Sequence, residues 1–159
     1  MKATGNDVNR IGISSDTNAL PVERAWLRRA AKHVLCAMDF SDAEISLYIC
    51  DEEKMRALNA EWRGRDQVTD VLSFAQREGE QGDPDDVYLG DIVICSARAK
   101  AQAAAAGIQF YDEIQNLLVH GAAHLVGYDH ERGRKEAKAM REFEAKIKQK
   151  MEAAFAGQT

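Results

Sequence analysis

The stretch DEIQNLLVHGAAHLVGYDH, residues 112–130, decides what kind of domain this chain forms. Its apolar residues recur three and four positions apart, which predicts a helix that begins near Asp112 and continues to Gly127. The apolar side of this helix consists of Ile114, Leu117, Leu118, Gly121 and Leu125. Glycine readily adopts the left-handed conformation that ends a helix, so the chain is expected to reverse direction at Gly127.

Three of the four histidines of the chain fall within the last eleven residues of this stretch. His120 and His124 are four positions apart, so their rings lie one above the other on the same face of the predicted helix. The reversal at Gly127 then brings His130 back toward them. Three imidazoles converging on one point suit a zinc ion and leave a fourth position for water. The pattern predicts a catalytic metal site, with a closed structural zinc site and a set of surface histidines as the alternatives.

The same residues match the metzincin protease pattern H-E-x-x-H-x-x-G-x-x-H at every fixed position except one. Gly121 stands where that pattern has its glutamate base. Because glycine has no side chain to take a proton from water, peptide hydrolysis is disfavoured. What remains is a Lewis-acidic ion suited to a substrate that develops negative charge.

Strands and helices alternate through the rest of the chain. Alternating apolar residues predict strands at 11–13, 45–49, 70–74 and 88–95. Helical spacing predicts helices at 22–38, at 97–106 behind a Ser96 N-cap, and after 132. It also predicts a helix at 52–63 behind an Asp51 N-cap, with Met55, Leu58 and Trp62 on its apolar face. The expected fold class is α+β: a single domain over residues 1–159, with a small, mixed, mostly parallel sheet, about five helices and a zincin-like metal helix. Residues 1–7 and 156–159 are expected to be flexible tails.

The overall charge limits which partners the chain can bind. With 21 lysines and arginines against 26 acidic residues, the net charge is -5, so an RNA partner must be held by a local basic patch. The acidic loop at 78–86 is expected to lie away from RNA or to contact a protein. Three groups of basic residues are candidates for the patch: Arg24, Arg28, Arg29 and Lys32; Arg63 and Arg65; and Arg132, Arg134, Lys135 and Lys138.

The apolar stretches, the N-terminal residues and the cysteines indicate in which cellular compartment the protein is expected. No apolar stretch approaches the ~20 residues of a membrane span, so no membrane contact is expected. The N-terminal residues MKATGNDVNRIGISSD are polar where a signal peptide is apolar, which predicts a cytoplasmic protein. Cys36, Cys50 and Cys95 are widely spaced, and we interpret each as a small buried apolar residue.

A second polar segment, LNAEWRGRDQVTDVLSF at residues 58–74, spans the end of one predicted helix and the start of a strand. Its ordinary interpretation is a solvated turn. If Arg63 faces the metal, however, its guanidinium could hold a phosphate through two hydrogen bonds and offset transition-state charge. These residues would then complete a phosphodiesterase site.

Together with LGDIVIC at residues 89–95, both segments resemble the YbeY-type endoribonucleases, also called rRNA maturation factors, over about residues 45–150. The resemblance implies a zinc-dependent endoribonuclease that hydrolyses single-stranded RNA, matures the 3′ end of small-subunit rRNA and takes part in ribosome quality control. It implies one zinc ion on His120, His124 and His130, with Arg63 as the catalytic and substrate-binding residue. The implied partners are the ribosomal small subunit and its assembly factors.

Some features leave alternatives open. Val68 and Ala75 stand where the family commonly has proline, and Ala123 where it usually has leucine; these are packing and loop positions. Asp129 is either a hydrogen-bond acceptor behind an imidazole or an ordinary turn residue. No general base is evident: the proton could go to bulk solvent, to a substrate oxygen or to a carboxylate, for which Asp70 and Asp129 are candidates. The alternative functions are a non-catalytic ribosome-assembly or RNA-binding module with a structural zinc and, further, a metalloprotease.

Overall fold

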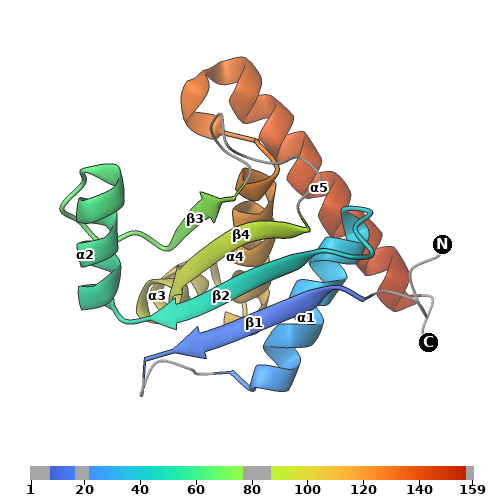
Figure 1. Cartoon of the computed structure of the whole chain (residues 1–159), viewed down its shortest axis with the longest axis horizontal. Coiled ribbons are helices and arrows are strands. Elements are labelled where there is room, and N and C mark those ends of the chain that lie inside the picture. The colour runs from blue at the N-terminus through green and yellow to red at the C-terminus, as the bar shows by residue number, and fades with distance from the viewer. Residues whose placement is uncertain (1–7, 17–21, 77–86, 157–159) are drawn as a thin grey trace.

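The structure is a computed structural model that describes residues 8–16, 22–76 and 87–156. The acidic loop and the expected tails lie outside these residues, apart from Ala156, which ends the last helix. Figure 1 shows the elements, which in chain order are β1 (Arg10–Ser15), α1 (Arg24–Ala37), β2 (Glu44–Cys50), α2 (Glu52–Arg63), β3 (Val71–Ala75), β4 (Tyr88–Cys95), α3 (Ser96–Ala106), α4 (Phe110–Leu125), the short 3-10 helix η1 (His130–Arg132) and α5 (Arg134–Ala156).

The four described strands form one mixed sheet in the order β1-β2-β4-β3. β1, β2 and β4 are parallel, and β3 pairs with β4 in the antiparallel direction. The α+β class, the mostly parallel sheet and the five α-helices are therefore confirmed. β3 is an edge strand, and it lies between α2 and the C-terminal half of α4 (Figure 1).

The two faces of the sheet are covered unequally. Alternate residues of the central strands, such as Leu47 and Ile92, join the main core with residues of α1, α3, α4 and α5. The opposite face carries a small second cluster, in which Met55 of α2 contacts the layer formed by Cys50, Leu72, Val93 and Cys95. α2 thus stands apart from the other helices, on the side of the sheet where β3 leaves an open edge.

Several helix boundaries differ from those expected. Ser96 is the first residue of α3, and Cys95 holds the N-cap position without a side-chain hydrogen bond, because β4 runs directly into the helix. α4 begins at Phe110, earlier than expected, because Gln109 and Asp112 form a reciprocal capping box. α1 spans Arg24–Ala37, so it is shorter than the expected range at both ends. The Asp51 cap of α2 is confirmed, since its side chain accepts a hydrogen bond from the Lys54 amide at 2.8 Å.

The cysteines follow the expectation in two cases of three. Cys50 and Cys95 are buried, whereas Cys36 is partly exposed. Burial raises the pKa of the Cys50 thiol to about 12, and it raises the pKa of Cys95 as well. No helix in the described part of the chain is long and apolar enough to span a bilayer.

Candidate metal centre

The histidine-bearing end of α4 is fixed by the burial of the helix. The expected apolar residues of α4 are buried, and so are Val119, Ala122 and Ala123, which places the last two turns firmly against the sheet. Gly127 follows with a φ of +105°, a backbone conformation that residues with a side chain rarely adopt. The expected reversal is thus present, and it brings the start of η1 beside the end of α4.

This reversal brings His120, His124 and His130 together. Their possible ligand atoms all lie within 4.8 Å of one another, and their ring centroids are 4.9, 5.3 and 5.4 Å apart. Burial, helped by the charges of the two neighbouring rings, lowers the pKa of His124, so this imidazole stays in the neutral form that binds metal. Three imidazole donors fit zinc and also other divalent transition metals. The residues present could therefore hold one such ion.

A carboxylate that was not predicted from the sequence contacts the His120 ring. Glu144 of α5 places its Oε2 atom 3.0 Å from Nδ1 of His120, and its side chain is only 18% exposed. When Nδ1–H donates to this carboxylate, Nε2 is left free to bind a metal. A signal was present in the sequence, because Glu144 interrupts the apolar stripe of α5 that Met140, Phe143 and Ile147 form.

Gly121 faces the sheet at very short range. A Cβ atom at this position would lie 2.8 Å from Cγ2 of Ile92 and 3.2 Å from Oγ of Ser73. The Ser73 hydroxyl also donates a hydrogen bond of 2.9 Å to the Gly121 carbonyl, which ties α4 to β3. A glutamate could not be accommodated here without moving the helix away from the sheet. The absence of a protease-type base is therefore built into the packing of α4.

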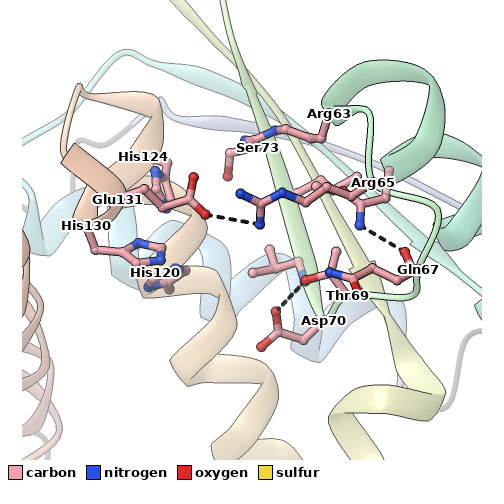
Figure 2. Close-up of a pocket in the computed structure, with 13 residues that line it drawn as sticks. Arg63, Arg65, Gln67, Thr69, Asp70, Ser73, His120, His124, His130 and Glu131 are labelled. Carbon is pink, nitrogen blue, oxygen red and sulfur yellow. Dashed lines mark hydrogen bonds and ion pairs between the residues drawn. The ribbon is translucent and has the colours of Figure 1, made fainter. Parts of the chain in front are cut away.

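The histidines open onto a pocket of about 440 Å³, a volume within the usual range for ligand sites. We call the side formed by α4 and η1, with the three histidines and Glu131, the metal wall. The opposite side, from Asn59 of α2 to Asp70 before β3, is the arginine wall. Figure 2 shows the side chains of Arg63 and Arg65 reaching from the arginine wall toward the metal wall.

Hydrogen bonds fix the backbone of the arginine wall, whose arginine side chains are exposed. α2 ends at Arg63 and is capped by Gly64, which has a φ of +68°. The buried Asn59 side chain donates to the Gln67 carbonyl at 2.9 Å. Arg56 binds both carboxylate oxygens of Asp66, at 2.8 and 3.1 Å. The backbone that carries Arg63 and Arg65 is thereby anchored on both sides of the turn.

The two arginines differ in their contacts. Nη1 of Arg65 lies 3.4 Å from Oε1 of Glu131, so this ion pair bridges the two walls. Arg63 lines the pocket with an exposed side chain, and its positive charge contributes to the lowered pKa of His124. From the sequence, Arg63 was expected to act only if it faced the metal, and in the structure it lines the same pocket as the three histidines.

The two candidate proton acceptors hold the backbone of their own segments. Asp70 lines the pocket, accepts a hydrogen bond from the Val71 amide at 2.8 Å and another from Gln102 at 3.2 Å. Asp129 accepts from the Glu131 amide at 2.9 Å and pairs with Arg132 at 3.3 Å. The hydrogen bond from the Glu131 amide is the main cause that lowers the pKa of Asp129. Asp129 therefore makes the contacts of a residue that caps η1.

Only one of the three expected basic groups reaches the pocket. Arg63 and Arg65 line it, whereas the lining includes no residue of α1 and no basic residue that follows His130. Arg24 of α1 donates instead to the Ile13 carbonyl at 2.9 Å, at the far side of the sheet. The positive charge available at the histidines thus comes from the arginine wall.

An α+β domain with two histidines one helical turn apart, and a third returned by a glycine turn, defines a zincin-like class of metal site. Within that class, the chain belongs to the family described as Endoribonuclease YbeY, whose family model matches residues 10–152. Membership of this family supports a role as an RNA endonuclease.

Individual relatives extend over most of the chain. An Endoribonuclease YbeY of Aquifex aeolicus is 36% identical over 155 residues, which cover 98% of this chain and all of that protein. The protein of the same name from Sulfurihydrogenibium sp. is 39% identical over 145 residues, covering 90% and 93% of the two chains. The solution structure of a Thermotoga maritima protein superposes with a TM-score of 0.61, with 23% identity and coverage of 94% and 93%. That similarity confirms the fold.

Proposed function

We propose that the protein is a zinc-dependent endoribonuclease that hydrolyses phosphodiester bonds of single-stranded RNA. We further propose that it acts in the cytoplasm on the 3′ end of small-subunit rRNA and in ribosome quality control, with the ribosomal small subunit and its assembly factors as partners. One observation carries the proposal: three histidines with converging donor atoms share a pocket with two arginines. Imidazoles for a cation and guanidiniums for a phosphate are the parts that phosphodiester hydrolysis needs.

Each wall has its own part in the reaction. A zinc ion held by His120, His124 and His130 would supply Lewis acidity, which lowers the pKa of a water and withdraws charge from a phosphate oxygen. The guanidinium of Arg63 donates hydrogen bonds to the oxygens of the scissile phosphate and orients it toward the histidines. As negative charge builds up in the transition state, the same hydrogen bonds strengthen, and this difference accelerates the reaction.

The carboxylates near the histidines in the described chain already have hydrogen-bond or ion-pair partners. Asp70 and Asp129 already accept backbone hydrogen bonds, and Glu131 is paired with Arg65. We therefore assign proton release to the solvent that reaches the exposed side of the pocket, where His130 lies.

The test is cleavage of a labelled single-stranded RNA by highly purified protein. Cleavage should stop on chelation and return when zinc is added. A His124→Ala variant purified in parallel is the control against contaminating nucleases, and it should be inactive under all conditions. Zinc binding and RNA binding without cleavage would instead support the non-catalytic assembly module and contradict the proposed activity.

A further inference from the structure

An exposed tryptophan stands at the end of the arginine wall. Trp62, in the last turn of α2, was expected on the apolar side of that helix, but it is 62% exposed. The reason is that the small cluster under α2 includes Met55 and the half-buried Leu58 of this helix but does not reach Trp62. Among the exposed large apolar residues of the described chain, Trp62 has the highest exposed fraction. The exposed indole therefore leaves a flat aromatic surface accessible next to Arg63 in the chain.

The indole has a defined position relative to the pocket. Trp62 directly precedes Arg63, and it lies three residues after Asn59, so it occupies the side of α2 next to the one that lines the pocket. Its ring contacts the ring of Phe74 edge-on, with centroids 6.0 Å apart and an angle of 72° between the planes. Phe74 follows the pocket residue Ser73 on the edge strand β3. Because successive residues of a strand face opposite sides, this contact holds the indole on the α2 side of β3, beside the pocket residue Arg63 in the chain, and most of the indole surface stays accessible.

We infer that Trp62 is a stacking platform for a nucleobase of single-stranded RNA adjacent to the phosphate held by Arg63. The inference rests on the proposed function, and it adds a base contact to that phosphate site. Unpaired bases of single-stranded nucleic acid stack on aromatic side chains next to cationic groups that hold the backbone. Here the aromatic ring and the cationic group belong to consecutive residues at the end of α2, so the base and the phosphate would be held by neighbouring positions of the same helix.

Such a platform selects for unpaired RNA without selecting a sequence. Every base has a π face, so stacking tolerates all four bases, whereas a base inside a duplex has both faces covered. The pocket would therefore prefer single-stranded substrate because of Trp62, while the chemistry at the histidines stays the same for any phosphodiester.

The test compares Trp62→Ala, Trp62→Leu and Trp62→Phe in the zinc-loaded full chain, using a labelled single-stranded oligonucleotide. Binding should weaken at least roughly five-fold for the alanine and leucine variants and remain near the parental level for phenylalanine, which keeps a π face. KM should rise with little change in kcat. The matched control is Tyr111→Ala, which removes another exposed aromatic whose ring lies edge-on to Trp26 at 4.7 Å.

A second arm identifies the base contact directly. The same oligonucleotide is prepared with an abasic residue at each position in turn, and one substitution should weaken binding to the parental protein but not to Trp62→Ala. Equal RNA affinity of Trp62→Ala and parental protein would overturn the inference, and so would a leucine variant that binds as well as phenylalanine. Because the readout is binding, a protein that binds RNA without cleaving it would contradict the proposed function and leave this inference in place.

Discussion

The metal wall and the arginine wall face one pocket, but they are held by different means. On the metal wall, His120 and His124 project from a helix buried on nearly all sides, and Glu144 supports one ring from behind. On the arginine wall, the backbone is anchored by hydrogen bonds, whereas the side chains of Arg63 and Arg65 are exposed and Arg65 makes only a solvent-exposed ion pair with Glu131. The three histidines are thus held together by the fold itself, whereas the two exposed guanidiniums can adjust to a ligand. Metal binding and phosphate binding should therefore be separable by mutation.

The largest effect is expected on the metal wall. His124→Ala removes one of the two half-buried histidines of the site, so bound zinc and RNA cleavage should both fall below detection while circular dichroism shows an intact fold. Metal content is measured by mass spectrometry on the purified protein. His33→Ala, which changes the remaining histidine on α1, is the control and should retain zinc. A His124→Ala protein that keeps one zinc per chain would contradict the assignment of the three histidines as the zinc ligands.

The next largest effect is expected from Arg63 on the arginine wall, whose loss should reduce turnover without affecting metal binding. Arg63→Ala should keep its zinc but lose roughly 10²- to 10³-fold in kcat, the usual cost of removing one donor aimed at transition-state charge. Arg63→Lys should recover only part of the rate, because an ammonium cannot donate the paired hydrogen bonds of a guanidinium. Arg28→Ala on α1 is the control for general charge loss. Parental turnover in Arg63→Ala would remove that residue from the mechanism.

A smaller effect is expected from Glu144, the carboxylate that contacts the His120 ring. Glu144→Gln keeps the shape of the side chain but removes the charge that orients His120, so zinc affinity should fall roughly 10- to 100-fold. The measurement is a competition titration against a chromophoric chelator. Glu142→Gln on the same helix is the matched control, because Glu142 is exposed and pairs only loosely with Lys138, at 3.9 Å. Equal zinc affinities of the Glu144→Gln and Glu142→Gln proteins would show that Glu144 does not orient His120 for metal binding.

The smallest effect concerns the ion pair between the walls. Arg65 and Glu131 are both exposed, and exposed pairs contribute about 0–1 kcal/mol, so Glu131→Gln should leave the thermal midpoint nearly unchanged. Freeing Arg65 for phosphate should tighten RNA binding by no more than roughly five-fold, with the gain shrinking as salt rises. Anisotropy titrations at two salt concentrations measure this. Weaker RNA binding in Glu131→Gln would indicate that the carboxylate helps to hold the substrate.

The metal wall could be predicted from the sequence because its determinants are local. The four-residue spacing of His120 and His124, and a glycine three residues after the second, depend only on helix geometry and backbone conformation. The buried side of α4 followed from periodicity in the same way. The sequence shows that Gly121 replaces a glutamate base. Its close approach to Ile92 could not be predicted, because it depends on the position of β4 beneath the helix.

The arginine wall could be predicted only through a resemblance. Nothing in the residues around Arg63 distinguishes a phosphate site from a solvated turn, because its place in the pocket depends on β3 pairing antiparallel at the sheet edge. Strand order is a property of the whole fold and leaves no local pattern. Trp62 shows the same limit, since helical spacing assigned it to an apolar face that the small cluster does not reach.

The central claim is that three imidazoles bind the cation, and X-ray absorption at the zinc edge of the zinc-loaded protein tests it most directly. We expect a first shell of nitrogen and oxygen at ~2.0–2.1 Å, with outer-shell scattering from three histidine rings that disappears in His124→Ala. A sulfur shell at ~2.3 Å, or a spectrum that the His124 variant leaves unchanged, would place the zinc elsewhere and contradict the account.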